Sequence, residues 1–325
     1  MSKHTENQFD DDLSNRKENL LINQVSKAVE NSGIKQIGES RHDLKQERYN
    51  ELSNAGEKAD SHNVNKGIGI TSYASLHKFQ SNISVFGKWC FGSEGLNSIY
   101  QIKPEHVAGF LQEACDREYA KNSVQSFATS IEKLAVVLDR VAPIAEPRTE
   151  TWHEAVKSCK DEIAACPAKD TETRAYADPR GMIDAMDSPQ MQMIATMQLD
   201  YGLRIGDATK IDAAKIDGST LVFENSKNGQ DLRIELKAED VEKINALADA
   251  DGKINVRQSD YAEALKDACH ATGQTWTGTH GLRHNYAQDR MDTLTSEGKT
   301  WTQALYIVSE EMGHHRVDIT LTYLR

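Results

Sequence analysis

Apolar residues recur at helical spacing over most of this 325-residue chain, and this pattern constrains the fold more than any other feature. Between residues 70 and 140 it predicts three helices. The first begins after Thr71 or Ser72, either of which can cap it. Pro104 opens the second helix, and the third covers about 122–140. We therefore expect a small helical bundle here.

One stretch departs from the helical pattern. Residues 221–224 and 232–236 alternate apolar and polar side chains, and Asn228-Gly229 lies between them. Because Asn-Gly favours a type I′ turn, this stretch predicts a β-hairpin. Further helices are expected near 258–271, 281–294 and 300–312. The predicted fold class is mainly α with a small β-hairpin: a helical N-terminal domain followed by an α+β domain.

The length suits two domains and an appendage rather than one compact core. Residues 1–65 are polar and predict a helical arm or tail. Residues 66–142 are assigned to the helical domain and residues 151–325 to the second domain. The Pro-containing segment 143–150 is the predicted linker between them.

The net charge is −12, which by itself argues against a nucleic-acid-binding protein. The distribution is uneven, because residues 66–148 hold nine basic and eight acidic side chains whereas residues 149–325 hold 20 and 30. A phosphate-binding face in the second domain must therefore be a local cluster on an acidic body.

No apolar run approaches the ~20 residues that span a bilayer, and the N-terminal residues lack a secretory pattern. The five cysteines include no CxxC pair, so neither a disulfide framework nor a zinc knuckle is indicated. We expect a cytoplasmic protein without membrane contact.

Three segments carry the chemistry: residues 200–207, 279–284 and 311–323. The first holds Arg204, with Asp207 one helical turn further on to brace it. In the second, His280 and Arg283 are spaced to project from one helix face near its N-terminus, where backbone N–H groups favour an anion.

The third segment places His314 after Gly313, a predicted helix end, and Tyr323 nine residues later. Each residue alone has an ordinary structural interpretation, such as an ion pair or core packing. Two arginines, two histidines and a tyrosine, without a metal-ligand cluster, together indicate metal-free chemistry on a phosphate. Tyrosine can serve as the covalent nucleophile.

This order of motifs resembles the tyrosine recombinase, or phage integrase, family over about residues 175–325. By that resemblance Arg204 and Arg283 match the two phosphate-binding arginines, and Lys227 matches the lysine of the family's β-hairpin. Residues 66–142 resemble the family's core-binding, SAM-like domain.

The resemblance assigns the remaining roles as well. His280 matches the first residue of the His-x-x-Arg pair, and His314 matches the His or Trp position. Tyr323 matches the nucleophile, and Asp207 stands where the family has a buttressing acid. His284 matches a common neighbour that is not counted as catalytic.

The resemblance implies site-specific recombination of double-stranded DNA in the nucleoid, as in mobile genetic elements. Strands are cut and rejoined through a 3′-phosphotyrosyl intermediate and a Holliday junction, without ATP, metal or other cofactor. The implied assembly is a homotetramer on specific recombination sites. An accessory DNA-bending protein is a further partner that the resemblance allows. In the helical domain the candidate DNA-binding residues are Lys78, Lys88, Lys121 and Lys133.

Two alternatives remain open: a type IB topoisomerase-like enzyme that relaxes DNA by similar chemistry, and a non-catalytic DNA-binding relative. A metal-dependent nuclease is disfavoured by the residue types.

Overall fold

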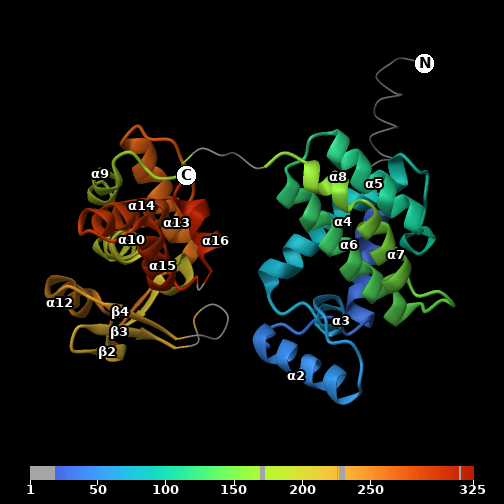
Figure 1. Ribbon diagram of the computed structural model, residues 1–325, viewed down its shortest axis with the longest axis horizontal. Coiled ribbons are helices and arrows are strands. Elements are labelled where there is room, and N and C mark those ends of the chain that lie inside the picture. The colour runs from blue at the N-terminus through green and yellow to red at the C-terminus, as the bar shows by residue number, and fades with distance from the viewer. Residues whose placement is uncertain (1–18, 169–172, 225, 227–230, 315) are drawn as a thin grey trace. The chain divides into compact units, whose positions relative to one another are not determined.

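The computed structural model describes residues 19–168, 173–224, 226, 231–314 and 316–325 (Figure 1). The chain divides into two compact units, residues 1–170 and 171–325, each with its own hydrophobic core. Across the described residues, no helix combines the length and the apolar character that crossing a bilayer requires.

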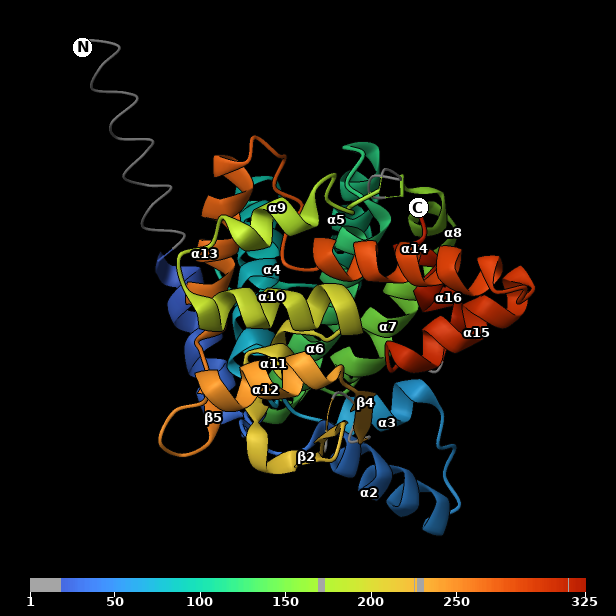
Figure 2. The ribbon, with the colours of Figure 1, turned by 90° about the vertical axis from the view of Figure 1, so that its left-hand side faces the viewer.

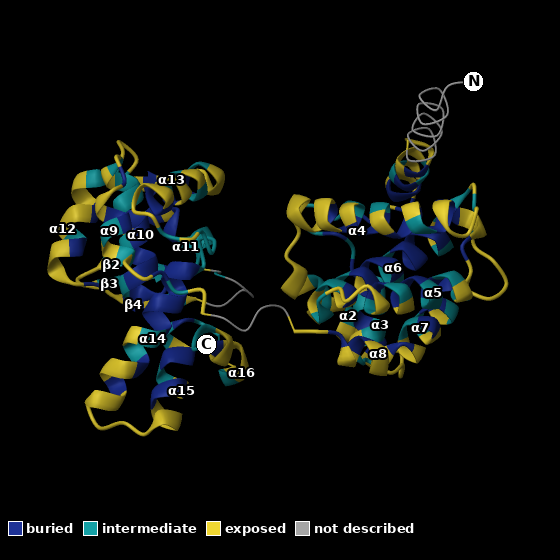
Figure 3. Cartoon of the chain, turned by 90° about the horizontal axis from the view of Figure 1, so that it is seen from above, coloured by how far each residue is buried: buried dark blue, intermediate teal, exposed yellow. Residues whose placement is uncertain are grey.

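The first unit is helical throughout its described part. Residues 19–31 form its first helix. The others are α2 (Arg41–Asn54), α3 (Ser61–Gly67), α4 (Tyr73–Gly92), α5 (Pro104–Asp116), α6 (Lys121–Val141), α7 (Arg148–Ser158) and α8 (Lys160–Ala165), with the 3-10 turn η1 (Ile99–Gln101). Figure 3 shows their buried sides turned inward and their exposed sides outward.

The three predicted helices of the bundle are confirmed as α4, α5 and α6. Ser72 caps α4, since its side chain accepts a hydrogen bond from the Ser75 backbone N–H at 3.1 Å. The Phe110 ring lies 5.1 Å from Phe86 and 5.5 Å from Phe127, so one aromatic cluster joins the three helices.

The first unit extends beyond the predicted bundle at both ends. Upstream, Leu21, Val25 and other apolar residues of segment 19–34 are buried in its core, so this segment is not a separate arm. Downstream, α7 and α8 bury Trp152 and Ile163 in the same core. The break between units therefore falls after residue 170 and not at 143–150, because the proline segment turns the chain back onto the bundle.

The second unit packs helices around two small antiparallel sheets. The helices are α9 (Pro179–Asp184), α10 (Pro189–Tyr201), α11 (Ile205–Ala208), α12 (Ala238–Leu247), α13 (Gln258–Ala271), α14 (Gly281–Ser296), α15 (Trp301–Glu311) and α16 (Val317–Thr320), with 3-10 turns η2 (Ala213–Lys215) and η4 (Leu321–Tyr323). Figure 2 shows α10 beside α14, the pair that positions the site described below.

The predicted hairpin is confirmed as β3 (Thr220–Phe223) and β4 (Leu232–Glu235), with Leu221 opposite Ile234. A short β2 (Ile216–Asp217) adds a third strand on the β3 side. The second sheet pairs β1 (Lys210–Asp212) with β5 (Lys253–Asn255) and was not predicted.

A substitution at Trp152 tests whether α7 is part of the core of the first unit. The Trp152 side chain is fully buried in that core, so we expect Trp152→Ala to lower the free energy of unfolding by about 3–5 kcal/mol. Urea unfolding of the full chain measures this. Lys160→Ala, at an exposed position of α8, is the control and should change stability by less than about 0.5 kcal/mol. Equal effects of the two substitutions would contradict the assignment.

Candidate active site

Tyr323 lies at the centre of the predicted cluster, in the 3-10 turn η4. Its ring centroid is 4.6 Å from that of His284, 5.1 Å from that of His314 and 6.5 Å from that of His280. The Cζ atom of Arg283 lies 5.6 Å from the same ring centroid. The structure thus brings together, around one phenol, four side chains from the start of α14 and the end of α15.

The start of α14 is held against the segment that precedes α9. The Asn285 side chain accepts a hydrogen bond from Tyr176 N at 2.9 Å and donates one to Tyr176 O at 2.8 Å. A Cβ at Gly281 would lie 2.3 Å from the Tyr176 ring, so only glycine fits this close approach. His280 is the N-cap residue, and Arg283 follows in the first turn, as the spacing predicts.

Arg283 is the most buried cation of the site, with 1% of its surface exposed. Its guanidinium donates to the carbonyls of Gly202 and, at 3.3 Å, Met312, and lies 3.1 Å from His314 Nε2. Burial lowers the pKa of Arg283 to about 10, opposed by the nearby Tyr323. The side chain therefore stays charged at neutral pH while it joins the ends of α10 and α15.

His314 is held in one orientation by two partners. Because a guanidinium can only donate, His314 Nε2 accepts from Arg283. The ring proton then resides on Nδ1, which donates to Thr320 Oγ1 at 2.9 Å. Gly313, with φ +61°, ends α15 as predicted and turns the histidine toward Tyr323.

Arg204 is the N-cap residue of α11, directly after the turn that ends α10. Its Nη2 donates to the Gly313 carbonyl at 2.6 Å. The two arginines therefore link the turn after α10 to the turn after α15. Arg204 donates to Gly313 in the turn after α15, and Arg283 donates to Gly202 at the end of α10.

Asp207 has a partner that the sequence did not indicate. Both of its carboxylate oxygens accept from Ser226 Oγ at 3.1 Å. Ser226 immediately precedes Lys227, which lies outside the described residues. Asp207 thus fixes the end of the hairpin segment next to the predicted lysine, and the role of Lys227 stays a prediction.

Two further residues contact the segment that carries Tyr323: His284, expected only as a non-catalytic neighbour, and Gln288, which the sequence analysis missed. His284 is buried against Tyr323, and desolvation, with the charge of Arg174 second, lowers its pKa to about 4. Gln288 Nε2 donates to Thr173 Oγ1 at 3.0 Å, Tyr323 O at 3.1 Å and Arg325 O at 3.0 Å. His280, His284 and Gln288 follow one another at steps of four residues, which places all three on one face of α14, a signal that the sequence does contain.

The four lysines predicted to bind DNA occupy different settings in the first unit. Lys78 is exposed beside a cavity of about 860 Å³ that Lys133 also lines. Lys133 is partly buried, and its Nζ donates to the carbonyls of Asn65 and Ile68, at 3.0 and 2.5 Å. Burial lowers the pKa of Lys133 to about 8.

Lys88 borders a separate cavity of about 310 Å³ beside Trp89. Lys121 Nζ lies 3.4 Å from the Ala164 carbonyl. Lys78 and Lys88 are thus exposed, whereas the ammonium of Lys133 holds the end of α3, and DNA binding by these lysines stays a prediction.

No protein-family model matches the sequence, and no curated protein matches it. Solved structures do. A phage lambda integrase dimer bound to a COC′ core site has 14% identity and a TM-score of 0.55 over 89% of this chain and 78% of that chain. A dimer of lambda integrase residues 75–356 on the same site has 15% identity and a TM-score of 0.54 over 87% and 95%.

An integrase of the transposon Tn1549, in complex with a circular intermediate DNA, has 12% identity and a TM-score of 0.50 over 87% of this chain and 94% of that chain. This chain therefore has the tyrosine recombinase, or phage integrase, fold that the sequence motifs predict, mainly helical with small antiparallel sheets.

The lowered pKa of His284 has a consequence for stability. Because the folded state disfavours the proton, the stabilising effect of this group is complete above pH 6.5 and is lost as the pH falls toward 4. We expect an NMR titration of its ring to show a midpoint near 4. The signal is assigned by its absence in His284→Asn, and a midpoint near 6.5 would contradict the prediction.

Gln288 is expected to hold the chain segment that carries Tyr323. Gln288→Leu removes its hydrogen bonds to Tyr323 O and Arg325 O, so amide exchange of residues 321–325 should accelerate about tenfold. Hydrogen-exchange mass spectrometry measures this. The control is Asp292→Asn at an exposed position of the same helix. Unchanged exchange in Gln288→Leu would show that other contacts hold the segment.

Proposed function

We propose that this protein is a site-specific DNA recombinase that cuts and rejoins strands with Tyr323 as nucleophile. The observation that carries the proposal is the phenol of Tyr323 enclosed by Arg283, His314 and His280, with Arg204 on the adjoining turn. The similar structures include a lambda integrase tetramer bound to a Holliday junction, which supports DNA as the partner and a homotetramer as the assembly.

In the proposed reaction the Tyr323 oxygen attacks a DNA phosphodiester. A P–O(Tyr) bond forms, the P–O5′ bond breaks, and the 3′ end stays on the enzyme. The 5′ oxygen leaves with a proton, for which Lys227 is the proposed donor. The reverse attack by a 5′-hydroxyl rejoins a strand, so bond energy is conserved and the step needs neither ATP nor a metal.

Arg204 and Arg283 are the proposed stabilisers of the charge that builds on the phosphoryl oxygens. His314 Nε2 accepts from Arg283, so we propose that His314 adds a hydrogen bond to these oxygens only when Nε2 carries a proton. Arg283 Nε is buried and has no hydrogen-bond partner among the described residues, so it is a donor left over for such an oxygen. Loss of one preorganised donor typically costs ~10²–10³ in rate. His280 is the proposed base or positioning group for the phenol proton, because its ring lies edge-on to Tyr323.

The first unit is the proposed core-binding domain. Arg41, Lys66, Lys78 and Lys133 line its large cavity, although the protein as a whole is acidic. Phosphate contacts there should make DNA affinity fall steeply with salt.

A covalent-trapping assay tests the nucleophile. Nicked duplexes tiled across the DNA that flanks the gene should form a denaturation-resistant adduct with the wild-type chain and none with Tyr323→Phe, because only the phenol oxygen can form the phosphotyrosyl bond. The matched control is Tyr306→Phe, which alters an exposed tyrosine of α15 and should keep the adduct.

Other outcomes separate the alternatives. An adduct that persists in Tyr323→Phe would refute the assignment. Relaxation of supercoiled DNA without joined products would favour the topoisomerase, and DNA binding without any adduct would favour the non-catalytic relative. Loss of all activity in EDTA would favour a metal-dependent nuclease.

A further inference from the structure

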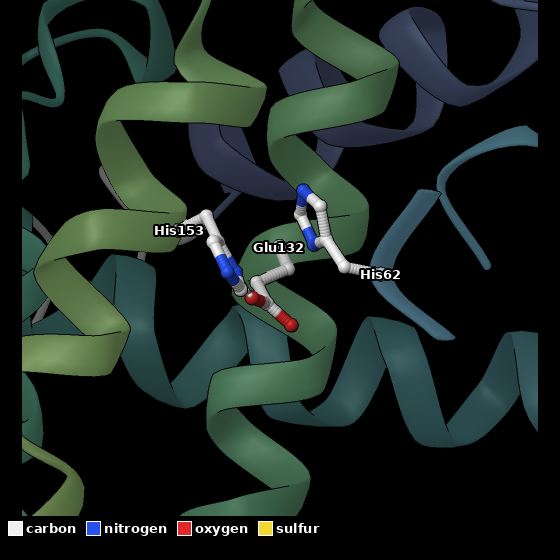
Figure 4. A group of neighbouring side chains, drawn as sticks. All are labelled: His62, Glu132 and His153. Carbon is white, nitrogen blue, oxygen red and sulfur yellow. Dashed lines mark hydrogen bonds and ion pairs between the residues drawn. The ribbon is translucent and has the colours of Figure 1, made fainter. Parts of the chain in front are cut away.

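A cluster of potential metal ligands lies in the first unit, among residues that the recombination mechanism does not use. His62 comes from α3, Glu132 from α6 and His153 from α7 (Figure 4). One donor atom from each side chain lies within 4.8 Å of the others. Three elements far apart in the sequence therefore bring two imidazoles and a carboxylate to one place.

Contacts within the cluster satisfy some of its polar atoms but not all of them. His153 Nδ1 lies 2.6 Å from Glu132 Oε1, so these two side chains share a proton. The ring of His62 stacks on that of His153, with centroids 3.8 Å apart. Yet His62 Nε2 is buried and, within the described part of the chain, has no hydrogen-bond partner. Buried polar atoms without partners are few in native structures, and each calls for an explanation.

We propose that His62, Glu132 and His153 form a binding site for a divalent transition-metal ion, of which zinc is the type. Two imidazoles and one carboxylate are a recurrent ligand set for such ions. Magnesium and calcium fit poorly, because they prefer oxygen ligands. The ion replaces the proton between His153 and Glu132 and gives His62 Nε2 its missing partner.

The geometry requires only side-chain movement. Tetrahedral zinc with bonds of about 2.0–2.1 Å keeps its ligand atoms roughly 3.3 Å apart. Rotation about side-chain bonds would open the 2.6 Å contact between His153 Nδ1 and Glu132 Oε1 and close the wider separations, which are at most 4.8 Å, to that value. Water or Glu150 completes the shell; both histidines act electrostatically on the Glu150 carboxylate, which is now paired with Lys66.

A bound ion would join α3 to the bundle. At present α3 is held there by the Lys133 ammonium, which donates to Asn65 O and Ile68 O at its C-terminal end. Lys66, also near the C-terminal end of α3, pairs with Glu150 of α7. The ion adds an attachment at the N-terminal end of α3, through His62. It is therefore structural and separate from the Tyr323 chemistry, which needs no metal.

The test titrates the full-length chain, freed of metal by dialysis against chelator, with Zn²⁺ and with Co²⁺. We expect one equivalent to bind with a dissociation constant of micromolar order or lower and to raise the thermal midpoint of the first unit. Glu132→Gln and His153→Gln should each weaken binding by at least about 100-fold. His77→Gln, which alters an exposed histidine of α4, is the matched control and should bind as the wild type does.

Several results would overturn the proposal. One is zinc affinity unchanged in both ligand variants, checked as folded by circular dichroism. Another is loss of binding in His314→Ala, which would place the ion among the active-site histidines. A third is an intense near-ultraviolet thiolate band with Co²⁺, which would place it on Cys115 and Cys166. These readouts do not depend on DNA cleavage, so they stand or fall independently of the proposed function.

Discussion

The buried guanidinium of Arg283 is the interaction on which the arrangement of the second unit depends. A charge with 1% exposure needs acceptors for its donors, and the Nη1 and Nη2 atoms find them in the carbonyls of Gly202 and Met312 and the ring of His314. Only Nε has no partner among the described residues. These acceptors lie at the ends of α10 and α15. The arginine therefore fixes two helix ends and His314 relative to α14.

Arg204 makes this arrangement reciprocal. It donates to the carbonyl of Gly313, so the turn after α15 is held by both arginines, and His314 leaves that turn with its tautomer already set by Thr320. The side chains of this cluster are preorganised, because the fold itself sets their positions; the proposed reaction would gain from this, since its donors would not have to reorganise. The same contacts also stabilise the fold. Replacing either arginine would leave the carbonyls that it binds without that donor and would lower the stability of the unit.

The sequence predicted the parts of this unit that follow from local rules. Asn228-Gly229 between alternating stretches located the hairpin, and the spacing of His280 and Arg283 placed both at the start of α14. The β1–β5 pair was not predictable in this way, because three-residue strands about 40 residues apart carry no periodic signal. His284 and Gln288 lie on the same helix face as His280, but the sequence alone does not show that the chain end packs against that face.

The unit boundary and the lysines show a second limit. Proline and polar residues at 143–150 have the composition of a linker, yet Trp152 and Cys159 return the chain to the first core, a tertiary contact that composition cannot show. Likewise a lysine looks the same in sequence whether it faces solvent, as Lys78 does, or holds two carbonyls, as Lys133 does.

The acidic net charge of −12 is compatible with phosphate chemistry because the field at the phenol is local. The Cζ atom of Arg283 lies 5.6 Å from the centroid of the Tyr323 ring, and burial removes the water that would screen this charge, while Arg204 binds the Gly313 carbonyl on the turn that leads to His314. Acidic side chains on the exposed surface are screened by salt over about 8 Å under physiological conditions. They therefore act on the phenol of Tyr323 far less than the buried guanidinium of Arg283 does, so an acidic surface and a cationic cluster coexist in one unit.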